Sequence, residues 1–534
     1  MFALFFYIFS QYEEVTVLES IDTYANLSEF MGRALKQYAD KPAFSCLGQT
    51  LTFSQIEEKS NQLAAYYQHI GLQAGDRIVI QLPNLIQYPI AMYAALKAGL
   101  VVVNTNPLYT PREMLHQFND SGATAIVILK DLYGNLAGII EETGIQHVIL
   151  TAATDLLTAA DVSETGQGVG FNQALAIGSE LSFTPSQAVL DDVAVLQYTG
   201  GTTGVSKGAQ LSHRNIIANA LQTGLVLEGH CREGEEIFIC PLPLYHIYAF
   251  TVNMVLFAAK GNLNVLIPNP RDLDAFIGAI TPFKFTGFAG LNTLFVGLCS
   301  HPKFRTLDFS QFSLTLSGGT ALTSKAAETW LSVTGCTIAE GYGLSETAPV
   351  VCLNKPGKEE IGTVGAPLQD TIVELWDDED KPVADGDSGQ IVVQGPQVMQ
   401  GYWNMPEATA DSITADGFFK TGDVGVRLPN GNIKIVDRLK DMIIVSGFNV
   451  YPNEIEDVLV NCEGVLEAAV IGKPSDSTGE AVHAFVTLNG EQSSDAIIRY
   501  CREYLTAYKV PKTITIMDEL PKSTVGKILR RELR

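Results

Sequence analysis

Hydrophobic positions alternate between a strand period and a helical period from about residue 51 onward. An amphipathic stretch begins at residue 54, an apolar strand is expected over 77–82, a helix over 84–97 and a strand over 100–103. Two further apolar strands are expected near 125–128 and 148–150. This alternation is typical of an α/β domain with a substantial parallel sheet.

The later segments change in character. Residues 151–190 are small, polar and weakly periodic, which predicts a mobile surface connection without chemistry. A second α/β block is expected over 192–368, followed by a turn-rich β subdomain with strands at 372–376 and 389–394. The stretch after residue 441 has mixed strand and helix periods and is small enough for an independent lid.

The expected organisation therefore has two domains. With 534 residues and 46% apolar content, the chain exceeds what one hydrophobic core usually organises. We predict a large N-terminal α/β domain, residues 1–439, with two mixed and mostly parallel sheets plus the small β subdomain. A small, mobile α+β lid domain, residues 440–534, is expected to follow it.

Charge and cysteine content restrict the partners and the compartment. The 35 Lys and Arg against 59 Asp and Glu give a formal charge of −24, which argues against a nucleic-acid partner. The eight cysteines are scattered, as in a reducing compartment, so we expect a cytoplasmic protein. No apolar stretch has the length of a bilayer span, which leaves peripheral contact with the inner membrane. The oligomeric state stays open, with a homodimer as one option.

The first ten residues form an apolar segment that we interpret as a poor signal peptide. The segment has no basic flank and leads into Glu13 and Glu14 without a clear cleavage site. A membrane contact and a mis-set start codon are both compatible with it.

Residues 199–208, TGGTTGVSKG, follow an apolar strand and combine glycines, threonines and a lysine. Glycines allow backbone N–H groups to converge on an anion, hydroxyls add donors, and Lys207 supplies a positive charge. The segment is not a Walker A loop, because Gly208 follows the lysine where Ser or Thr is required. It predicts a polyphosphate cradle, and a glycine-rich hairpin without a ligand is the alternative that the loop alone leaves open.

Six further motifs follow that loop. They are residues 245–246 (YH), 341–347 (GYGLSET), 421–423 (TGD), 437–441 (DRLKD), 445–456 (VSGFNVYPNEIE) and 521–527 (PKSTVGK). In this order they resemble the motifs of the acyl-adenylate-forming superfamily of AMP-binding enzymes, and most of all those of bacterial long-chain fatty-acyl-CoA synthetases. The resemblance runs from about residue 30 to the end of the chain.

The resemblance implies an ATP-dependent long-chain fatty acid:CoA ligase that acts in fatty-acid degradation and lipid metabolism. Such an enzyme uses ATP and Mg²⁺ to convert a fatty carboxylate into acyl-AMP and pyrophosphate, and then transfers the acyl group to coenzyme A. Its catalytic residues would be Lys527, Lys207, Glu346 and His246. Lys527 would bridge the carboxylate and the α-phosphate, and Glu346 would bind Mg²⁺.

The resemblance also implies a moving lid. Lys440 occupies the hinge position; the lid would first present Lys527 and then rotate until the Gly447 loop lines the pantetheine channel. Asp423 would bind the ribose, and Ser345 stands where the family more often has threonine. The residues expected to bind nucleotide or coenzyme A are Thr199, Gly200, Gly201, Thr202, Thr203, Gly204, Lys207, Gly318, Gly319, Thr320, Gly341, Tyr342, Gly343, Ser345, Asp423, Arg438 and Gly447.

Taken singly, these residues have simpler interpretations. Lys527 could be a solvated tail lysine, His246 a core histidine, and Asp423 with Arg438 a loop salt bridge. Phe250 could gate an acyl tunnel, but core packing predicts the same residue. A ligase for medium-chain or aromatic acids remains an alternative, because chain length rests on overall resemblance alone.

Three more distant functions are weaker alternatives. A peptide-synthetase adenylation domain needs an acidic residue near His246, where Ile247 and Tyr248 stand instead. A luciferase-like oxygenase shares the first half-reaction, so the sequence excludes it less firmly than the other two. A non-catalytic fatty-acid binding or uptake protein would have no need of Lys527 or Glu346.

Overall fold

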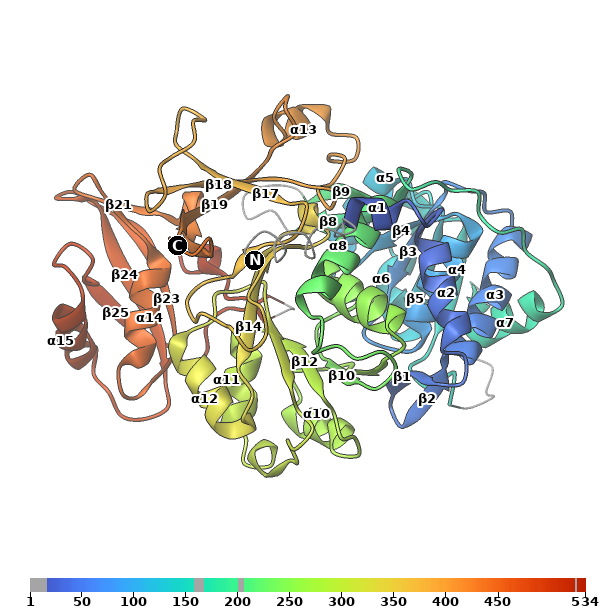
Figure 1. The fold of residues 1–534 in the computed structure, drawn as a ribbon, viewed down its shortest axis with the longest axis horizontal. Coiled ribbons are helices and arrows are strands. Elements are labelled where there is room, and N and C mark those ends of the chain that lie inside the picture. The colour runs from blue at the N-terminus through green and yellow to red at the C-terminus, as the bar shows by residue number, and fades with distance from the viewer. Residues whose placement is uncertain (1–16, 158–167, 200–205, 524–525) are drawn as a thin grey trace, which may run out of the picture.

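The computed structural model describes residues 17–157, 168–199, 206–523 and 526–534 (Figure 1). Its first sheet has seven strands, all parallel except the last one in spatial order, which closes a hairpin with its neighbour. In that order they are β7 (Val169–Gly170), β6 (His147–Thr151), β5 (Ala125–Leu129), β3 (Arg77–Gln81), β4 (Val101–Asn104), β8 (Val193–Thr199) and β9 (Lys207–Ser212).

The second sheet has nine strands, and its six central strands are mutually parallel. In spatial order they are β16 (Ala366–Pro367), β15 (Val350–Leu353), β14 (Ile338–Gly343), β13 (Leu314–Ser317), β12 (Gly287–Gly290), β10 (Ile237–Cys240), β11 (Leu263–Leu266), β1 (Pro42–Cys46) and β2 (Gln49–Thr52). The predicted α/β class with two mostly parallel sheets is therefore confirmed.

Helices bury a common core between the two sheets. Every residue of α4 is buried, and one hydrophobic cluster joins α4 to apolar residues of both sheets. The helices of the large domain are α1 (Val17–Ile21), α2 (Leu27–Gln37), α3 (Phe53–His69), α4 (Gln87–Ala98), α5 (Pro111–Ser121), α6 (Tyr133–Ala137), α7 (Phe171–Ser179), α8 (His213–Val226), α9 (Ile247–Ala249), the π-helix η3 (Phe250–Phe257), α10 (Leu273–Ile280), α11 (Asn292–Ser300) and α12 (Ser324–Thr334). Short 3₁₀ turns are η1 (Lys130–Leu132), η2 (Ile140–Glu142), η4 (Phe304–Thr306) and η5 (Ser345–Thr347).

Two local predictions need correction. The stretch over 151–190 is not wholly a surface connection, because β7 and α7 lie within it and Phe171 is fully buried. Helix α7 packs so closely on α3 that a Cβ at Gly178 would lie 1.8 Å from the carbonyl oxygen of Gln62. Helix α4 begins at Gln87 and not at 84, because the Asn84 amide instead donates to the carbonyls of Cys240 and Leu242.

A four-stranded antiparallel sheet and a mixed five-stranded sheet complete the chain. The first has β17 (Ile372–Trp376), β18 (Ser388–Gln394), β19 (Phe419–Arg427) and β20 (Ile433–Arg438), with α13 (Pro406–Ser412) beside it. The second has β21 (Ile443–Val445), β22 (Phe448–Val450), β23 (Val465–Ser475), β24 (Gly479–Leu488) and β25 (Thr513–Ile516), with α14 (Pro452–Asn461) and α15 (Ser494–Tyr504). The 3₁₀ turns η6 (Leu439–Asp441) and η7 (Arg530–Glu532) flank that last unit, which we call the lid.

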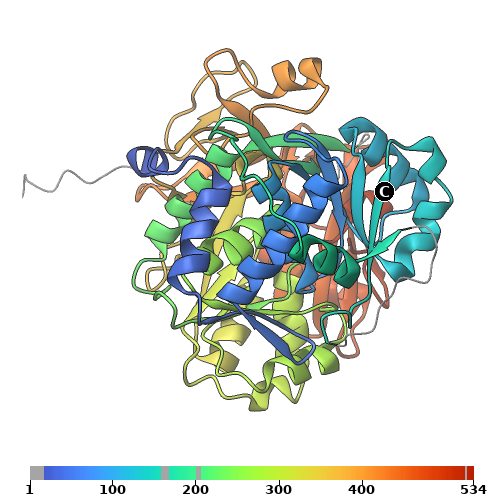
Figure 2. The same ribbon diagram turned by 90° about the vertical axis from the view of Figure 1, so that its right-hand side faces the viewer.

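The lid lies at the opposite end of the molecule from the N-terminal helices, as the two views show (Figures 1 and 2). It rests against α12, where Ser324 Oγ donates to the carboxylate of Asp457 on α14 at 3.1 Å. The predicted domain boundary between residues 439 and 440 stays a prediction. Among the described residues, no helix has both the length and the apolar character needed to cross a bilayer.

Candidate active site

The loop predicted to hold phosphate connects β8 to β9. Thr199 at the end of β8 pairs with Lys207 at the start of β9, so the segment is indeed closed by an antiparallel hairpin. Gly200, Gly201, Thr202, Thr203 and Gly204 lie outside the described residues. Ser212 then caps α8 by accepting from the backbone N–H of Asn215, which fixes where the helix begins.

Tyr402 joins Lys207 to Glu346 and was not predicted from the sequence. The Lys207 ammonium lies 4.8 Å from the centre of the Tyr402 ring, and the Tyr402 hydroxyl donates to a Glu346 oxygen at 2.8 Å. A backbone bridge between Ala209 and Tyr402 holds this arrangement. The only sequence sign was an aromatic residue after Gly401 in a turn-rich segment, and nothing there points to a carboxylate far away in the chain.

Glu346 is a nearly buried carboxylate at the end of β14, on the turn η5. Burial raises its pKa, while the hydrogen bond from Tyr402 and the charge of Arg438 act in the opposite direction. Within the described residues, no cluster of three or more His, Cys, Asp or Glu could hold a metal by itself. A single carboxylate still fits Mg²⁺, which takes most of its ligands from phosphate and water when it binds with a nucleotide.

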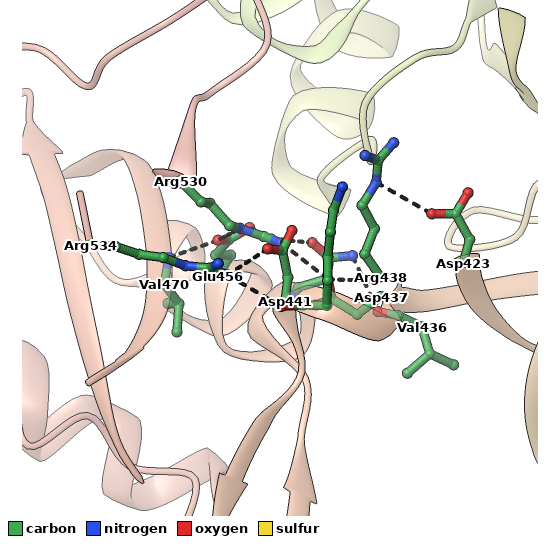
Figure 3. Close-up of polar contacts among 11 residues, drawn as sticks. Asp423, Val436, Asp437, Arg438, Asp441, Glu456, Val470, Arg530 and Arg534 are labelled. Atoms are coloured by element: carbon green, nitrogen blue, oxygen red, sulfur yellow. Dashed lines mark hydrogen bonds and ion pairs between the residues drawn. The ribbon is translucent and has the colours of Figure 1, made fainter. Parts of the chain in front are cut away.

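Asp423 connects three elements of the site. Its carboxylate accepts from the Tyr342 hydroxyl at 2.7 Å and pairs with Arg438 at 3.3 Å. Residues 423 and 438 are also register partners on β19 and β20, so the sheet itself places this ion pair. Figure 3 shows Arg438 extending to Asp423, away from a second cluster around Arg530. Because Asp423 is only 5% exposed, its pairing with Arg438 is a buried interaction and not a solvent-exposed loop salt bridge.

Lys527 reaches this cluster from the C-terminal end of the chain. Burial and the neighbouring Arg438 charge lower its pKa from 10.5 to about 8, partly offset by Asp423. The pKa of His246 falls to about 4, first through burial and then through the charge of Lys527. The lysine is therefore not a solvated tail residue in this structure. It lies within electrostatic range of both His246 and Asp423.

The loop that carries Lys527 is attached to the large domain by hydrogen bonds. Thr293 on α11 donates to the Gly526 carbonyl at 3.1 Å, and Arg271 donates to the Ser523 carbonyl at 3.2 Å. Gly526 has φ +86°, and a Cβ there would lie 2.9 Å from the Thr293 hydroxyl. A side chain at Gly526 would therefore strain the backbone and push the loop from its seat.

The turn after β13 approaches the same region. A Cβ at Gly318 would lie 3.3 Å from the Tyr248 ring and 3.5 Å from the Gly341 carbonyl oxygen, and Gly319 has φ +80°. The Thr320 hydroxyl is buried and has no hydrogen-bond partner among the described residues. A Cβ at Gly343 would lie 1.9 Å from the Pro349 carbonyl oxygen, so chain packing by itself already requires a glycine there, and its predicted role at the nucleotide stays a prediction.

Glu340 is a second residue that sequence analysis missed. It precedes Gly341 on β14, accepts from the Leu322 N–H at 3.0 Å and is only 8% exposed. Burial raises its pKa to about 8, although the bond from Leu322 acts against this. At neutral pH it is therefore mostly a neutral carboxylic acid that borders the Gly318 turn.

His246 is placed by the loop between β10 and α9. Its ring nitrogen accepts from the Tyr248 N–H as the N-cap of α9, and the preceding carbonyl of Tyr245 accepts from the Gln197 amide at 3.1 Å. Asn84 anchors the same loop by accepting from the Leu244 N–H at 2.8 Å. Phe250 follows as a fully buried residue at the start of η3. Its predicted role as a gate stays a prediction.

One predicted residue, Gly447, lies apart from this cluster, whereas Lys440 lies within electrostatic range of Arg438, Asp423 and Lys527. Gly447 is exposed in the turn between β21 and β22, with φ +83° and no atom within 4 Å of a Cβ built on it. Lys440 lies in η6, exposed at the surface but partly shielded from water by its neighbours; this partial desolvation and then the nearby Arg438 charge lower its pKa. Ser345 lies in η5 beside Glu346. In this structure Lys527 is therefore part of the cluster, whereas Gly447 lies outside it.

Comparisons with known proteins show the family to which the chain belongs. Residues 31–403 match the family model described as AMP-binding enzyme, and residues 454–527 match the AMP-binding enzyme C-terminal domain. A long-chain-fatty-acid–CoA ligase of Salmonella typhimurium is 46% identical over 96% of this chain and 95% of its own length. The ligase of the same name from Bacillus subtilis is 36% identical over 95% of this chain and 94% of its own length. An anthranilate CoA ligase solved with anthranoyl-AMP has a TM-score of 0.89 at 25% identity, covering 96% of this chain and 97% of its own.

Proposed function

The chain belongs to the AMP-binding enzyme family, and from this premise we propose that it is an ATP-dependent long-chain-fatty-acid–CoA ligase. Similarity along nearly the whole chain to ligases of that name supports the proposal. The observation that carries it is the position of Lys527, held within electrostatic range of His246 and Asp423 by a loop from the far end of the chain. A protein that only binds fatty acids gains nothing from this arrangement.

In the first half-reaction, a fatty carboxylate oxygen attacks the α-phosphorus of ATP. The bond from the α-phosphorus to the oxygen that bridges to the β-phosphorus breaks, and pyrophosphate leaves. Both reactants are anionic, so the reaction needs positive charge at the point of attack. We propose that Lys527 lies between the carboxylate and the α-phosphate, and that Lys207 neutralises charge on the departing phosphates.

The other residues hold the reactants. Asp423 would accept from the ribose hydroxyls, with its orientation fixed by Tyr342 and Arg438. His246, neutral at pH 7 because its pKa is about 4, would contact the substrate carboxylate as a hydrogen-bond donor without adding charge. Glu346 would hold Mg²⁺, which neutralises phosphate charge when bound, and Tyr402 orients that carboxylate.

In the second half-reaction, the coenzyme A thiol loses its proton and its sulfur attacks the acyl carbonyl carbon. The bond from that carbon to the phosphate oxygen of AMP breaks, which releases AMP and the thioester. The exposed Gly447 turn lies apart from the adenylation cluster, so we propose that the lid rotates about Lys440 to bring it there. A residue without a Cβ leaves room for the narrow pantetheine arm.

Membrane contact, where it occurs, would be peripheral in this proposal. A formal charge of −24 repels anionic headgroups, so attachment would depend on apolar side chains and would resist high salt.

The test is a series of acids from acetate to oleate, with benzoate as an aromatic member. Pyrophosphate release from acid and ATP without coenzyme A measures adenylation, and acyl-CoA formation measures the complete reaction. We expect both activities to be highest with the long-chain acids. Highest activity with short or aromatic acids would revise the substrate, and absence of pyrophosphate release with every acid would refute the ligase.

A further inference from the structure

Arg530 is surrounded by carboxylates three residues after Lys527. Its guanidinium pairs with Asp437 at 3.1 Å, with Asp441 at 3.5 Å and with Glu456 at 2.8 Å (Figure 3). The Arg530 side chain is 16% exposed, and that of Asp437 is 1% exposed. Charge-assisted hydrogen bonds of this kind are stronger than surface ion pairs, since water competes little for them.

The three acidic partners lie on different sides of the predicted hinge at Lys440. Asp437 is on β20, in the four-stranded sheet that precedes the hinge. Asp441 and Glu456 follow the hinge, and Glu456 is fixed within the lid by accepting from the Val470 N–H at 2.8 Å. A second hydrogen bond also crosses the hinge, because Asp437 accepts from the Asn453 N–H of α14 at 2.9 Å.

Arg530 lies at the base of the hydrogen-bonded loop that carries Lys527. The backbone of the loop is closed by hydrogen bonds from Ser523 to the Lys527 carbonyl at 2.7 Å and from Leu529 to the Pro521 carbonyl at 2.8 Å. The tail packs into the lid through Leu533, which is 8% exposed. The contacts of Arg530 therefore hold the base of the loop that carries the lysine.

We propose that Asp437 and Arg530 form a latch that holds the lid in the position that presents Lys527, with Arg530 as a positioning residue for that lysine. This inference rests on the proposed ligase function. A rotation about Lys440 would carry Arg530, Asp441 and Glu456 together and leave Asp437 behind. The contacts of Asp437 to the lid are thus specific to one lid position, and those of Glu456 to Arg530 are common to both.

The charges make such a latch reversible. When Asp437 separates from Arg530, the guanidinium keeps two carboxylate partners inside the lid, so no unpaired buried cation is created. The Asp437 carboxylate still accepts a hydrogen bond from the Arg438 N–H at 2.8 Å. The latch therefore favours the adenylation position without preventing its release.

Two matched substitutions test the latch. Asp437→Asn removes the carboxylate charge that pairs with Arg530 across the hinge. Glu456→Gln removes a carboxylate charge that pairs with the same arginine within the lid. For each variant we would measure adenylation as pyrophosphate exchange, and thioester formation from supplied acyl-AMP and coenzyme A. We expect Asp437→Asn to lower adenylation about tenfold or more and to leave thioester formation equal or faster. Glu456→Gln should change both rates by the same factor.

A substrate-free measurement separates this inference from the proposed function. Trypsin cleavage after the exposed hinge residue Lys440 should be faster in Asp437→Asn than in the unaltered protein, and unchanged in Glu456→Gln. Absence of adenylation in the unaltered protein would refute the ligase, and the cleavage rates would still decide the latch. Equal effects of Asp437→Asn on both half-reactions, or equal cleavage of the two variants, would overturn it.

Discussion

Replacing Lys527 with alanine should stop acyl-adenylate formation and leave thioester formation from supplied acyl-AMP largely intact. The lysine lies in the adenylation cluster, but the exposed Gly447 turn does not, so one lid position uses the lysine and the other does not. Removing a group that stabilises charge in a transition state costs on the order of 10² to 10³ in rate. Pyrophosphate exchange measures the first half-reaction, and acyl-CoA formed from acyl-AMP measures the second.

The loss should not come from unfolding. A pKa lowered from 10.5 to about 8 means that keeping Lys527 charged in the folded protein costs about 3 kcal/mol at neutral pH. Alanine removes this cost, so we expect the melting temperature to stay the same or rise. Lys522→Ala is the matched control in the same loop, because Lys522 pairs with Glu467 at 2.8 Å and lies outside the proposed site.

The pH profile provides an independent measurement of the same lysine. With a pKa of about 8, Lys527 is about nine-tenths charged at pH 7 and about one-tenth charged at pH 9. Adenylation kcat/KM for ATP should therefore fall above about pH 8, and kcat should fall at higher pH because bound phosphate favours the charged form. Glu340 also has a pKa of about 8, so the profile should be repeated in Glu340→Gln.

Three results would refute this reasoning. The first is an equal loss of both half-reactions in Lys527→Ala. The second is a comparable loss in the Lys522 control. The third is an alkaline fall that disappears in Glu340→Gln, which would assign the titration to the carboxylic acid.

Two further substitutions, the second with a matched control, test the geometry around the site. Tyr402→Phe removes the hydroxyl that orients Glu346. We expect the adenylation rate to fall about tenfold and the Mg²⁺ concentration needed for activity to rise in a titration at fixed ATP. An unchanged Mg²⁺ requirement would limit Tyr402 to a packing role. Gly526→Ala and Gly431→Ala meet the same backbone strain, with φ +86° and +88°, but only the first would push against Thr293. We expect the two variants to have similar melting temperatures, with adenylation lost mainly in Gly526→Ala. Equal adenylation in both variants would contradict the inference that the contact with Thr293 holds the loop that carries Lys527.

The sequence determined much of the local structure. Apolar runs identified β3, β5 and β6, because strands buried on both faces are nearly continuous in apolar residues. Local chemistry also sets the starts of α8 and α14, where the Ser212 hydroxyl accepts from a free N–H group and Pro452 has none to satisfy. The ordered motifs also indicated the family, because each of them is local in the chain.

Only the tertiary structure decided which distant groups meet. Helix α7 has a weak sequence pattern and exists because it packs on α3. Tyr402 donates a hydrogen bond to Glu346, and Lys527 comes within electrostatic range of His246, although no periodicity relates the segments that carry them. The pairing of Asp437 with Arg530 is of the same kind, since it depends on where the lid rests. Periodicity records what one segment buries, whereas a site depends on how separately folded segments pack together.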